Sequence, residues 1–203
     1  MISELSTHLR ETIEIVPGVR EMAVLHELAK LREEGPYDRI VLDAPATGHG
    51  IHFLEAPAKS ARILAGPLKS RAEALHAMLQ DPGATDVVLV TLAEETPVRE
   101  AHELAETLRR DGFALDNVVV NKWLPRVFED DEGRRALASL PPTDPWAAAM
   151  RLVAAQREEG DAHLEELRAL DAKLAIVPLI PDSSRRLVKV AEAMKDFVPG
   201  GPR

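Results

Sequence analysis

The chain has 203 residues, a formal net charge of −9, only 3% aromatic residues and no Cys. The negative charge argues against a nucleic-acid binder, because neutralising phosphates requires clustered Lys and Arg. Without Cys there is no disulfide and no thiolate site for zinc, which fits a cytoplasmic protein. No apolar run approaches the roughly 18 residues of a membrane span, so we expect any membrane contact to be indirect.

Helical and strand patterns alternate along the chain. The strands are short apolar runs, and Gly or Pro ends most of the segments. In chain order the expected strands are 12–16, 40–42, 86–92, 117–120 and 175–177. The expected helices are 19–33, 57–79, 97–110 with Thr96 as its N-cap, a helical region broken near 140–142 and resuming over 146–170, and 184–197. Strands separated by helices predict an α/β fold with a parallel sheet.

An acidic residue follows the apolar run Ile40–Leu42. Carboxyl ends of parallel strands bind ligands, and Asp43 at such an end can hold a hydrated Mg²⁺. Pro45 and Gly48 shape the following loop so that backbone N–H groups can face a phosphate. An ordinary β-turn with Asp43 capping backbone groups explains this short pattern equally well.

Further polar loops follow two later strands, at 93–96 and at Asn121–Lys122. If the strands are neighbours, these loops and the loop 43–49 converge on one edge of the sheet. The carboxamide of Asn121 both donates and accepts, so it can read a purine edge, although an ordinary loop Asn is the commoner case. The Pro-rich loop 178–182 suits packing against a flat ring, or is simply a turn.

Several other polar or apolar groups have an ordinary structural explanation that we favour. His49 and His52 have metal-binding spacing but no third ligand nearby. Glu94 and Glu95 suit a solvated helix start better than a catalytic pair. Surface positions are favoured for Arg185 and Arg186, and core packing for Met150, Leu152 and Val153.

Taken together, the segments Asp43–His49, Val118–Pro125 and Pro178–Pro181 resemble the ArsA-type anion-transporting ATPases. This family includes arsenite-pump ATPases and tail-anchored-protein targeting factors. Val16–Glu21 and Thr91–Glu100 support the resemblance, which covers nearly the whole chain in the expected order. It implies a three-layer, P-loop NTPase-like α/β fold of the deviant Walker class, incomplete at its N-terminal side. Residues 1–203 are then a single partial ATPase domain with a helical insertion at about 126–171.

The resemblance also implies roles for individual residues and a cofactor, Mg-ATP. Asp43 matches the Walker B aspartate, which holds Mg²⁺ through water. Asn121 matches the adenine-reading Asn, with Lys122 beside it. Switch II, the γ-phosphate sensor, corresponds to Pro45, Thr47, Gly48 and His49, and the loop that closes over the base corresponds to Pro178, Leu179, Ile180 and Pro181.

Two family elements are missing from the sequence. It contains no Gly-rich loop ending in Gly-Lys-Ser/Thr and no switch I with the family's water-activating Asp. We therefore expect weak or no binding of Mg-ATP by this chain alone, and no hydrolysis. The absence of Cys also excludes the family's arsenite-binding thiolates and its zinc-binding Cys pair.

Three functional hypotheses follow from the resemblance and its departures. The first is the carboxyl-terminal portion of an ArsA-like ATPase, carrying switch II and the adenine loops. The second is a non-catalytic regulatory or scaffolding subunit, whose partner would be a second copy or a full-length ArsA-like relative. A carrier for hydrophobic helices, resting on the Ala- and Leu-rich segment 146–170, is the third.

Overall fold

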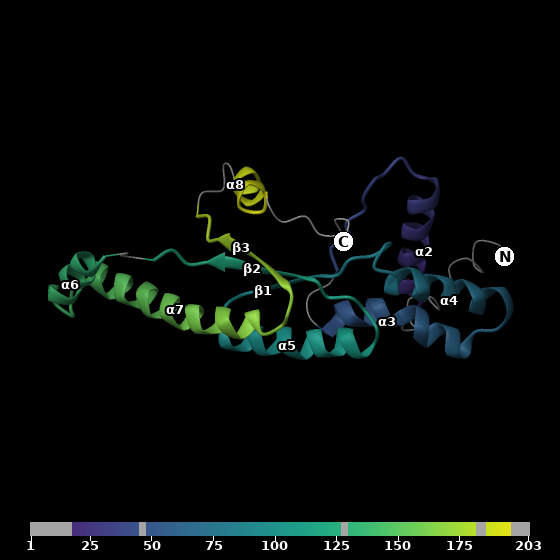
Figure 1. Cartoon of the computed structure of the whole chain (residues 1–203), viewed down its shortest axis with the longest axis horizontal. Coiled ribbons are helices and arrows are strands. Elements are labelled where there is room, and N and C mark those ends of the chain that lie inside the picture. The colour runs from purple at the N-terminus through teal and green to yellow at the C-terminus, as the bar shows by residue number, and fades with distance from the viewer. Residues whose placement is uncertain (1–17, 45–47, 127–129, 182–185, 196–203) are drawn as a thin grey trace, which may run out of the picture. The chain divides into compact units, whose positions relative to one another are not determined.

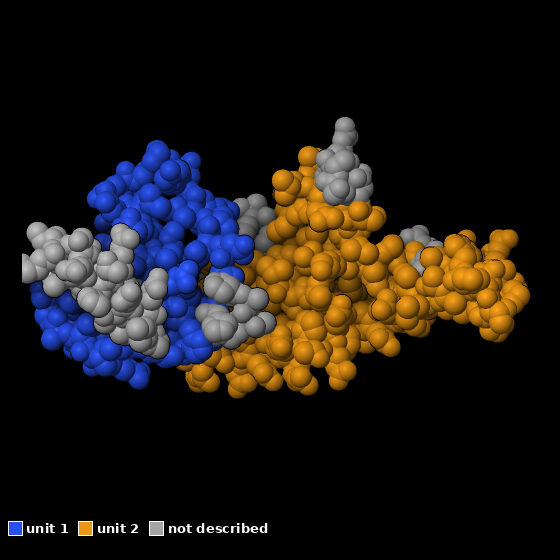
Figure 2. Space-filling model, turned by 180° about the vertical axis from the view of Figure 1, so that it is seen from behind, with its two compact units in different colours: residues 1–85 blue, residues 86–203 orange. Residues whose placement is uncertain are grey.

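The computed structural model describes residues 18–44, 48–126, 130–181 and 186–195. The chain divides into two compact units, residues 1–85 and residues 86–203 (Figure 2), and each is described by itself below. The strand expected at 12–16, the loop residues Pro45 and Thr47, and Arg185 lie outside the described residues. The prediction of a single domain over 1–203 stays a prediction.

The first unit is helical in its described part. It contains α2 (Val19–Glu34), α3 (Gly48–Ile63) and α4 (Gly66–Gln80), and each of these helices contacts the other two. Arg71 of α4 donates from Nε to His26 Nδ1 of α2 at 3.1 Å. The helix expected at 19–33 is confirmed. Buried apolar side chains form the core between the helices, namely Leu25, Ala29, Phe53, Ala56, Ala72, Leu75 and Leu79.

The single helix expected over 57–79 is wrong, because two helices occupy this region. The chain breaks at Leu64 and Ala65, and Gly66 has a φ of +58°. Pro67 explains the break, because its ring disfavours a helical conformation in the preceding residue. Pro57, expected to begin the helix, instead lies inside α3.

The buried strand expected at 40–42 is also wrong. Residues 39–44 belong to no strand, and Val41 is 85% exposed and Leu42 41% exposed. A parallel strand exists only when neighbouring strands satisfy its backbone N–H and C=O groups. No described strand pairs with this segment, so its apolar pattern has no sheet to join.

The second unit is built on a parallel sheet. Its strands are β1 (Val88–Thr91), β2 (Asn117–Trp123) and β3 (Lys173–Pro178), in the order β1-β2-β3. Val119 is paired with Val90 on one side and with Ala175 on the other. Val118 and Val120 are fully buried on one face of the central strand and Val119 is only 5% exposed on the other, as expected for a strand covered on both faces. The predicted α/β fold with a parallel sheet is confirmed.

Helices lie on both faces of this sheet. α5 (Glu95–Arg110) and α7 (Pro145–Arg168) run along one face, and α8 (Arg186–Ala193) lies on the other (Figure 1). The second unit therefore has three layers. Val190 and Met194, in and just after α8, pack against Val119, Ala175 and Val177 of the sheet. α6 (Asp131–Ser139) precedes α7, so both helices fall in the region where a helical insertion was expected.

Side-chain caps start two of these helices. Asp144 Oδ1 accepts from Ala147 N at 2.9 Å at the start of α7, and Asp130 Oδ1 accepts from Gly133 N at 2.7 Å at the start of α6. The N-cap predicted at Thr96 is wrong. α5 begins at Glu95, and Pro97 is its third residue, which is tolerated because the first helical N–H groups have no acceptor within the helix.

Three contacts hold α7 in place. Arg109, at the end of α5, donates to the carbonyl of Leu170, just after α7. Arg151 donates to the carbonyls of Leu137 and Leu140 at 2.9 and 2.6 Å, which fixes α6. In the middle of α7, a Cβ on Gly160 would lie 3.3 Å from Cζ3 of Trp123 and 3.5 Å from the carbonyl oxygen of Ala93. A Cβ at this position would be tight against the Trp123 ring and in ordinary contact with the Ala93 carbonyl, so the site favours a residue without a side chain.

We predict that Gly160→Val lowers the free energy of unfolding by about 2 kcal/mol, because its Cβ is already tight against Trp123 and the two further methyl groups must be fitted into the same packed space. Ala162→Val, at an exposed position of the same helix, is the control and should cost about 0.5 kcal/mol of helix propensity. Urea titrations followed by circular dichroism measure both. Equal losses at the two positions would contradict the packing argument.

Candidate functional site

The carboxyl edge of the sheet in the second unit brings three loops together. β1, β2 and β3 are parallel neighbours, so their carboxyl ends lie side by side. The loops that follow them are 92–94, the end of β2 at Asn121–Lys122, and Leu179–Pro181. The expected convergence is thus confirmed for the loop after β1 and the end of β2, and the loop after β3 joins them. The loop 43–49 belongs to the first unit, and residues 45–47 of it lie outside the described residues.

A buried hydroxyl fixes the end of β1. Thr91 is 8% exposed, and its Oγ1 donates to the carbonyl of Pro97 at 3.1 Å and to that of Leu92 at 3.3 Å. This contact ties the strand end to the first turn of α5. Glu94 and Glu95, at the helix start, are exposed, which agrees with a solvated helix terminus.

β2 ends in a bulge at Asn121 and Lys122. Val120 pairs with Ile176 and Trp123 pairs with Pro178, so three steps along β2 match two along β3. Lys122 has a φ of +54°, a conformation that L residues adopt at a cost. Asn121 Oδ1 accepts from the Lys122 backbone N–H at 2.9 Å. The bulge places the predicted adenine-reading side chain at the carboxyl edge.

The loop after β3 is joined to this bulge. The Leu179 backbone N–H donates to the Trp123 carbonyl at 2.8 Å. Pro178, Leu179 and Pro181 are exposed, and Ile180 is half-buried. The edge of the sheet therefore combines one carboxamide at Asn121 with an apolar, Pro-rich loop beside it.

The residues expected to contact Mg²⁺ and phosphate lie in the first unit. Asp43 is exposed, and Gly48 and His49 form the first turn of α3. His52 lies 3.4 Å from Glu55, measured between Nδ1 and Oε2. Among the described residues, no three His, Cys, Asp or Glu side chains are grouped so that they could hold a metal ion. The metal role of Asp43 and the switch II role of Pro45, Thr47, Gly48 and His49 stay predictions.

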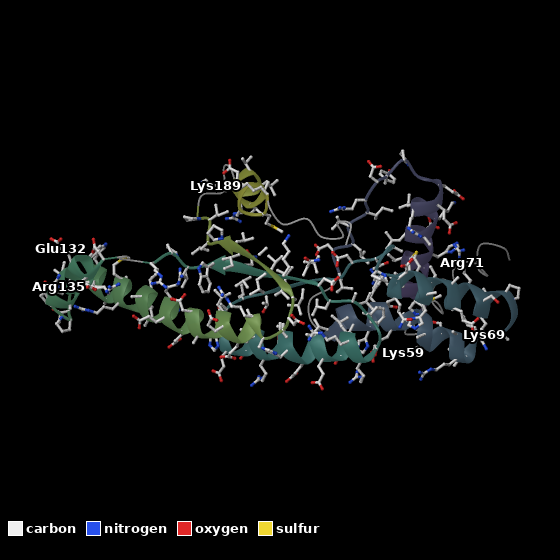
Figure 3. All side chains as sticks on the ribbon, in the orientation of Figure 1. Lys59, Lys69, Arg71, Glu132, Arg135 and Lys189 are labelled. Carbon is white, nitrogen blue, oxygen red and sulfur yellow. The ribbon has the colours of Figure 1, made fainter. Side chains whose placement is uncertain are left out.

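Several of the basic side chains labelled in Figure 3 have partners close by in the sequence. Lys59 bonds Glu55 at 2.5 Å, Lys69 pairs with Glu73 at 3.8 Å, and each pair lies within one helix. Arg135 donates to the carbonyl of Asp131 on α6. None of the helices in the described ranges is long and apolar enough to cross a membrane.

Sequence reasoning missed the side chains that support the bulge. Arg157 of α7 lies over the ring of Trp123, 4.2 Å from its centroid, and donates to the Leu124 carbonyl at 2.7 Å. The strand predicted from the sequence ends at residue 120, before Trp123, and no role was predicted for Arg157. The alternation of charges along α7 gave no signal for this contact.

Comparisons with known proteins show which family this sequence is similar to. A family model described as anion-transporting ATPase matches residues 1–72 and 65–137. The arsenical pump-driving ATPase of Acidiphilium multivorum is 34% identical over 110 residues, 53% of this chain and 19% of that protein. ATPase BagA of Mycobacterium tuberculosis is 31% identical over 129 residues, 60% of this chain and 38% of that protein. ATPase asna-1 of Caenorhabditis elegans is 22% identical over 208 residues, 85% of this chain and 60% of that protein.

A parallel α/β sheet with polar loops at its carboxyl edge is consistent with a P-loop NTPase-like fold, one of several open α/β folds that bind ligands at this edge. The chain belongs to the anion-transporting, ArsA-type ATPase family, because the family model matches more than half of its residues. It spans less than two thirds of the length of each relative named above. The matched residues include Asp43, Asn121 and Lys122, while Pro178–Pro181 lies beyond them.

We predict that Lys122→Gly raises the free energy of unfolding by up to about 1 kcal/mol, because Gly adopts a φ of +54° without the strain that a Cβ causes. Lys189→Gly, on the exposed face of α8, is the matched control and should cost about 1 kcal/mol. Thermal and urea unfolding measure both variants. A loss of stability in Lys122→Gly would show that the Lys122 side chain stabilises the fold by more free energy than its positive φ costs.

Proposed function

We propose that this chain carries the carboxyl-terminal portion of an ArsA-like ATPase and binds the adenine of ATP at the carboxyl edge of the sheet in its second unit. The observation that carries the proposal is the bulge at Asn121–Lys122, beside the apolar loop Leu179–Pro181. Hydrolysis would then require phosphate-binding residues that this sequence does not contain. Family membership and the match over Asp43 and Asn121 support the proposal.

The chemistry of the edge suits an adenine ring. An Asn carboxamide can accept from the N6 amino group of adenine and donate to a neighbouring ring nitrogen. Asn121 uses part of its Oδ1 capacity on the Lys122 N–H, which orients the carboxamide, and its Nδ2 group carries two N–H donors. The exposed surfaces of Pro178, Leu179 and Pro181 offer apolar contact to the ring face.

The missing phosphate loop gives the proposal a specific test. If the base supplies most of the contacts, Mg-ATP, ADP and AMP should bind with similar and weak affinity, with a Kd of about 0.1–1 mM, and GTP should bind more weakly. Two-dimensional NMR titration of the 203-residue chain measures such affinities. Affinity that rises steeply with each phosphate, or turnover of ATP by rigorously purified protein, would refute the proposal.

The sharpest single variant is Asn121→Asp. A carboxylate keeps the acceptor for the Lys122 N–H but loses both donors to the base, so we predict about a tenfold loss of ATP affinity with little change in stability. Gln156→Glu makes the same change from amide to acid at an exposed site on α7 and controls for the added charge. Equal weakening in both variants would point to a long-range charge effect instead of contact at Asn121.

A second candidate function is a scaffold that pairs with a full-length ArsA-like ATPase. The observation that favours it is the outer edge of β1, where Val90 is 63% exposed in the middle of the strand and no described strand pairs beyond it. Parallel sheets are normally covered and flanked, so such an edge favours a further strand. The partner would supply that strand.

We predict that Val90→Lys abolishes a complex with a full-length ArsA-like ATPase encoded in the same genome, because a charge on the edge blocks strand addition. Leu187→Lys, at an 84% exposed position on α8, should leave the complex intact. Sedimentation velocity of the mixture and of the chain alone distinguishes a mixed complex from a dimer of this chain. A mixture that sediments as two separate species would rule the scaffold out.

A further inference from the structure

One arginine on a helix of the second unit makes several contacts to the end of β2. Arg157, in the middle of α7, has a side chain only 15% exposed. Its guanidinium lies 4.2 Å from the centroid of the Trp123 ring, and its Nη1 donates to the Leu124 carbonyl at 2.7 Å. A cation stacked on an indole and bonded to the backbone has one fixed orientation.

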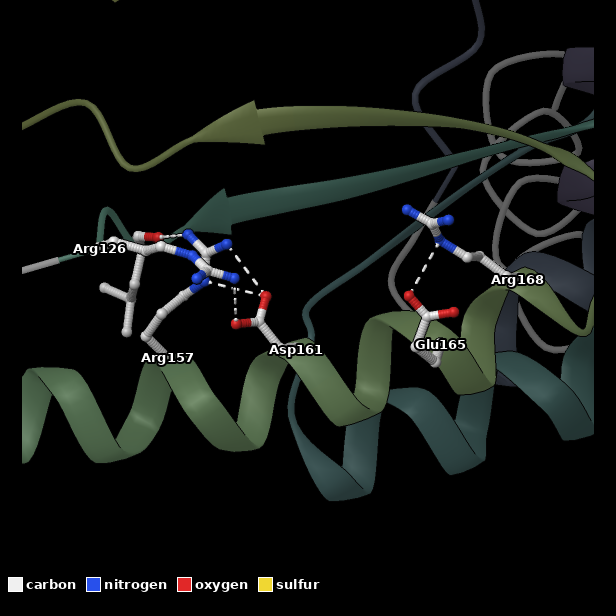
Figure 4. Close-up of polar contacts among 6 residues, drawn as sticks. Arg126, Arg157, Asp161, Glu165 and Arg168 are labelled. Atoms are coloured by element: carbon white, nitrogen blue, oxygen red, sulfur yellow. Dashed lines mark hydrogen bonds and ion pairs between the residues drawn. The ribbon is translucent and has the colours of Figure 1, made fainter. Parts of the chain in front are cut away.

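Asp161 fixes the plane of that guanidinium. Arg157 donates to Asp161 Oδ1 from Nε at 3.2 Å and from Nη2 at 3.0 Å, and Arg126 donates to Asp161 Oδ2 at 3.1 Å (Figure 4). The side chain of Arg126 is 54% exposed, so its own contribution is small. We call Trp123, Arg157 and Asp161 the Trp123 clamp.

The clamp lies directly after the bulge. Trp123 and Leu124 are the two residues that follow Lys122, and the clamp holds one by its ring and the other by its carbonyl. On the other side of the bulge, Val120 is held by its pairing with Ile176. The strained φ of Lys122 could relax by a shift in register if either end were loose. At the carboxyl end, the clamp holds Trp123 and Leu124 from the α7 side, in addition to the hydrogen bond from the Leu179 N–H to the Trp123 carbonyl.

We propose that Arg157 is a positioning residue, which acts through Trp123 and Leu124 to hold the Asn121–Lys122 bulge and so the direction of the Asn121 carboxamide. The effect on the ligand rests on the proposed adenine site, but the effect on the bulge does not. A residue that served only stability would leave the bulge and the choice of base unchanged in every variant that still folds.

The test is Arg157→Lys. Lysine keeps the charge but lacks the planar fork, so it cannot stack on Trp123, bond Leu124 and pair with Asp161 together. Without nucleotide, we expect shifted Lys122 and Trp123 amide signals and faster hydrogen exchange at Lys122. With nucleotide, we expect the ratio of ATP to GTP affinity to fall about fivefold, which is the value of one neutral hydrogen bond.

Arg168→Lys is the matched control on the same helix. Arg168 is exposed and pairs only with Glu165, at 3.5 Å, in the contacts drawn beside the clamp (Figure 4). We expect native amide signals and a native affinity ratio in this variant. Should Arg157→Lys fail to fold, Asp161→Asn replaces it, because it keeps the guanidinium and removes only the charge that orients it.

The outcomes separate the two proposals. A folded Arg157→Lys protein with native Lys122 signals and native hydrogen exchange would overturn the positioning role. If the unaltered chain binds no nucleotide, the adenine site fails, and the measurements without nucleotide still decide whether Arg157 holds the bulge. Altered amide signals with an unchanged ratio of affinities would overturn the link from the clamp to Asn121.

Discussion

The second unit depends on the central strand β2 having a hydrogen-bonded neighbour on each side. β1 and β3 satisfy its backbone, so Val118 and Val120 on one face and Val119 on the other can be buried under helices without unpaired N–H or C=O groups beside them. The same pairing defines the site. A bulge exists only relative to the strand beside it, and Asn121 reaches the carboxyl edge because β3 advances two residues while β2 advances three.

Residues 40–42 show what happens without that constraint. Ile40, Val41 and Leu42 are as apolar as the residues of β1, yet they form no strand and two of them are exposed. The apolar composition of a segment favours a covered strand, but the strand forms only if a neighbouring strand is available to pair with its backbone. The local sequence shows the preference for a strand but not whether a pairing partner is present.

Much of the second unit could be predicted for the same reason. β1, β2 and β3 are runs of Val, Leu and Ile with partners within the unit, and Asp144 and Pro145 mark the start of α7 in a way that local chemistry explains. The break at Leu64–Ala65 could also have been predicted, because Gly66 and Pro67 are signals for the end of a helix. The bulge could not be predicted from the sequence, because an extra residue in β2 is defined only by the register of its pairing with β3.

Some residues of the candidate site could likewise be predicted from the sequence, and others could not. Asn121 was predicted because it follows a buried strand within a segment that resembles the ArsA-type family, whereas the contact from Arg157 to Leu124 joins residues 33 positions apart. No periodic pattern encodes a pairing at that distance in a single sequence. The adenine role of Asn121 and the switch II role of the first unit remain predictions, and the bulge beside β3 gives the first of them its structural basis.

The stacking of Arg157 on Trp123 has an optical consequence. The chain contains two tryptophans, Trp123 with a cation 4.2 Å from its ring centroid and Trp146 with 55% of its surface exposed. An indole beside a fixed charge and one in water emit differently, and replacing Trp146 by Phe leaves a single emitter beside the bulge. The protein thus carries its own fluorescent reporter, without any added label, at the position where we expect the base to bind.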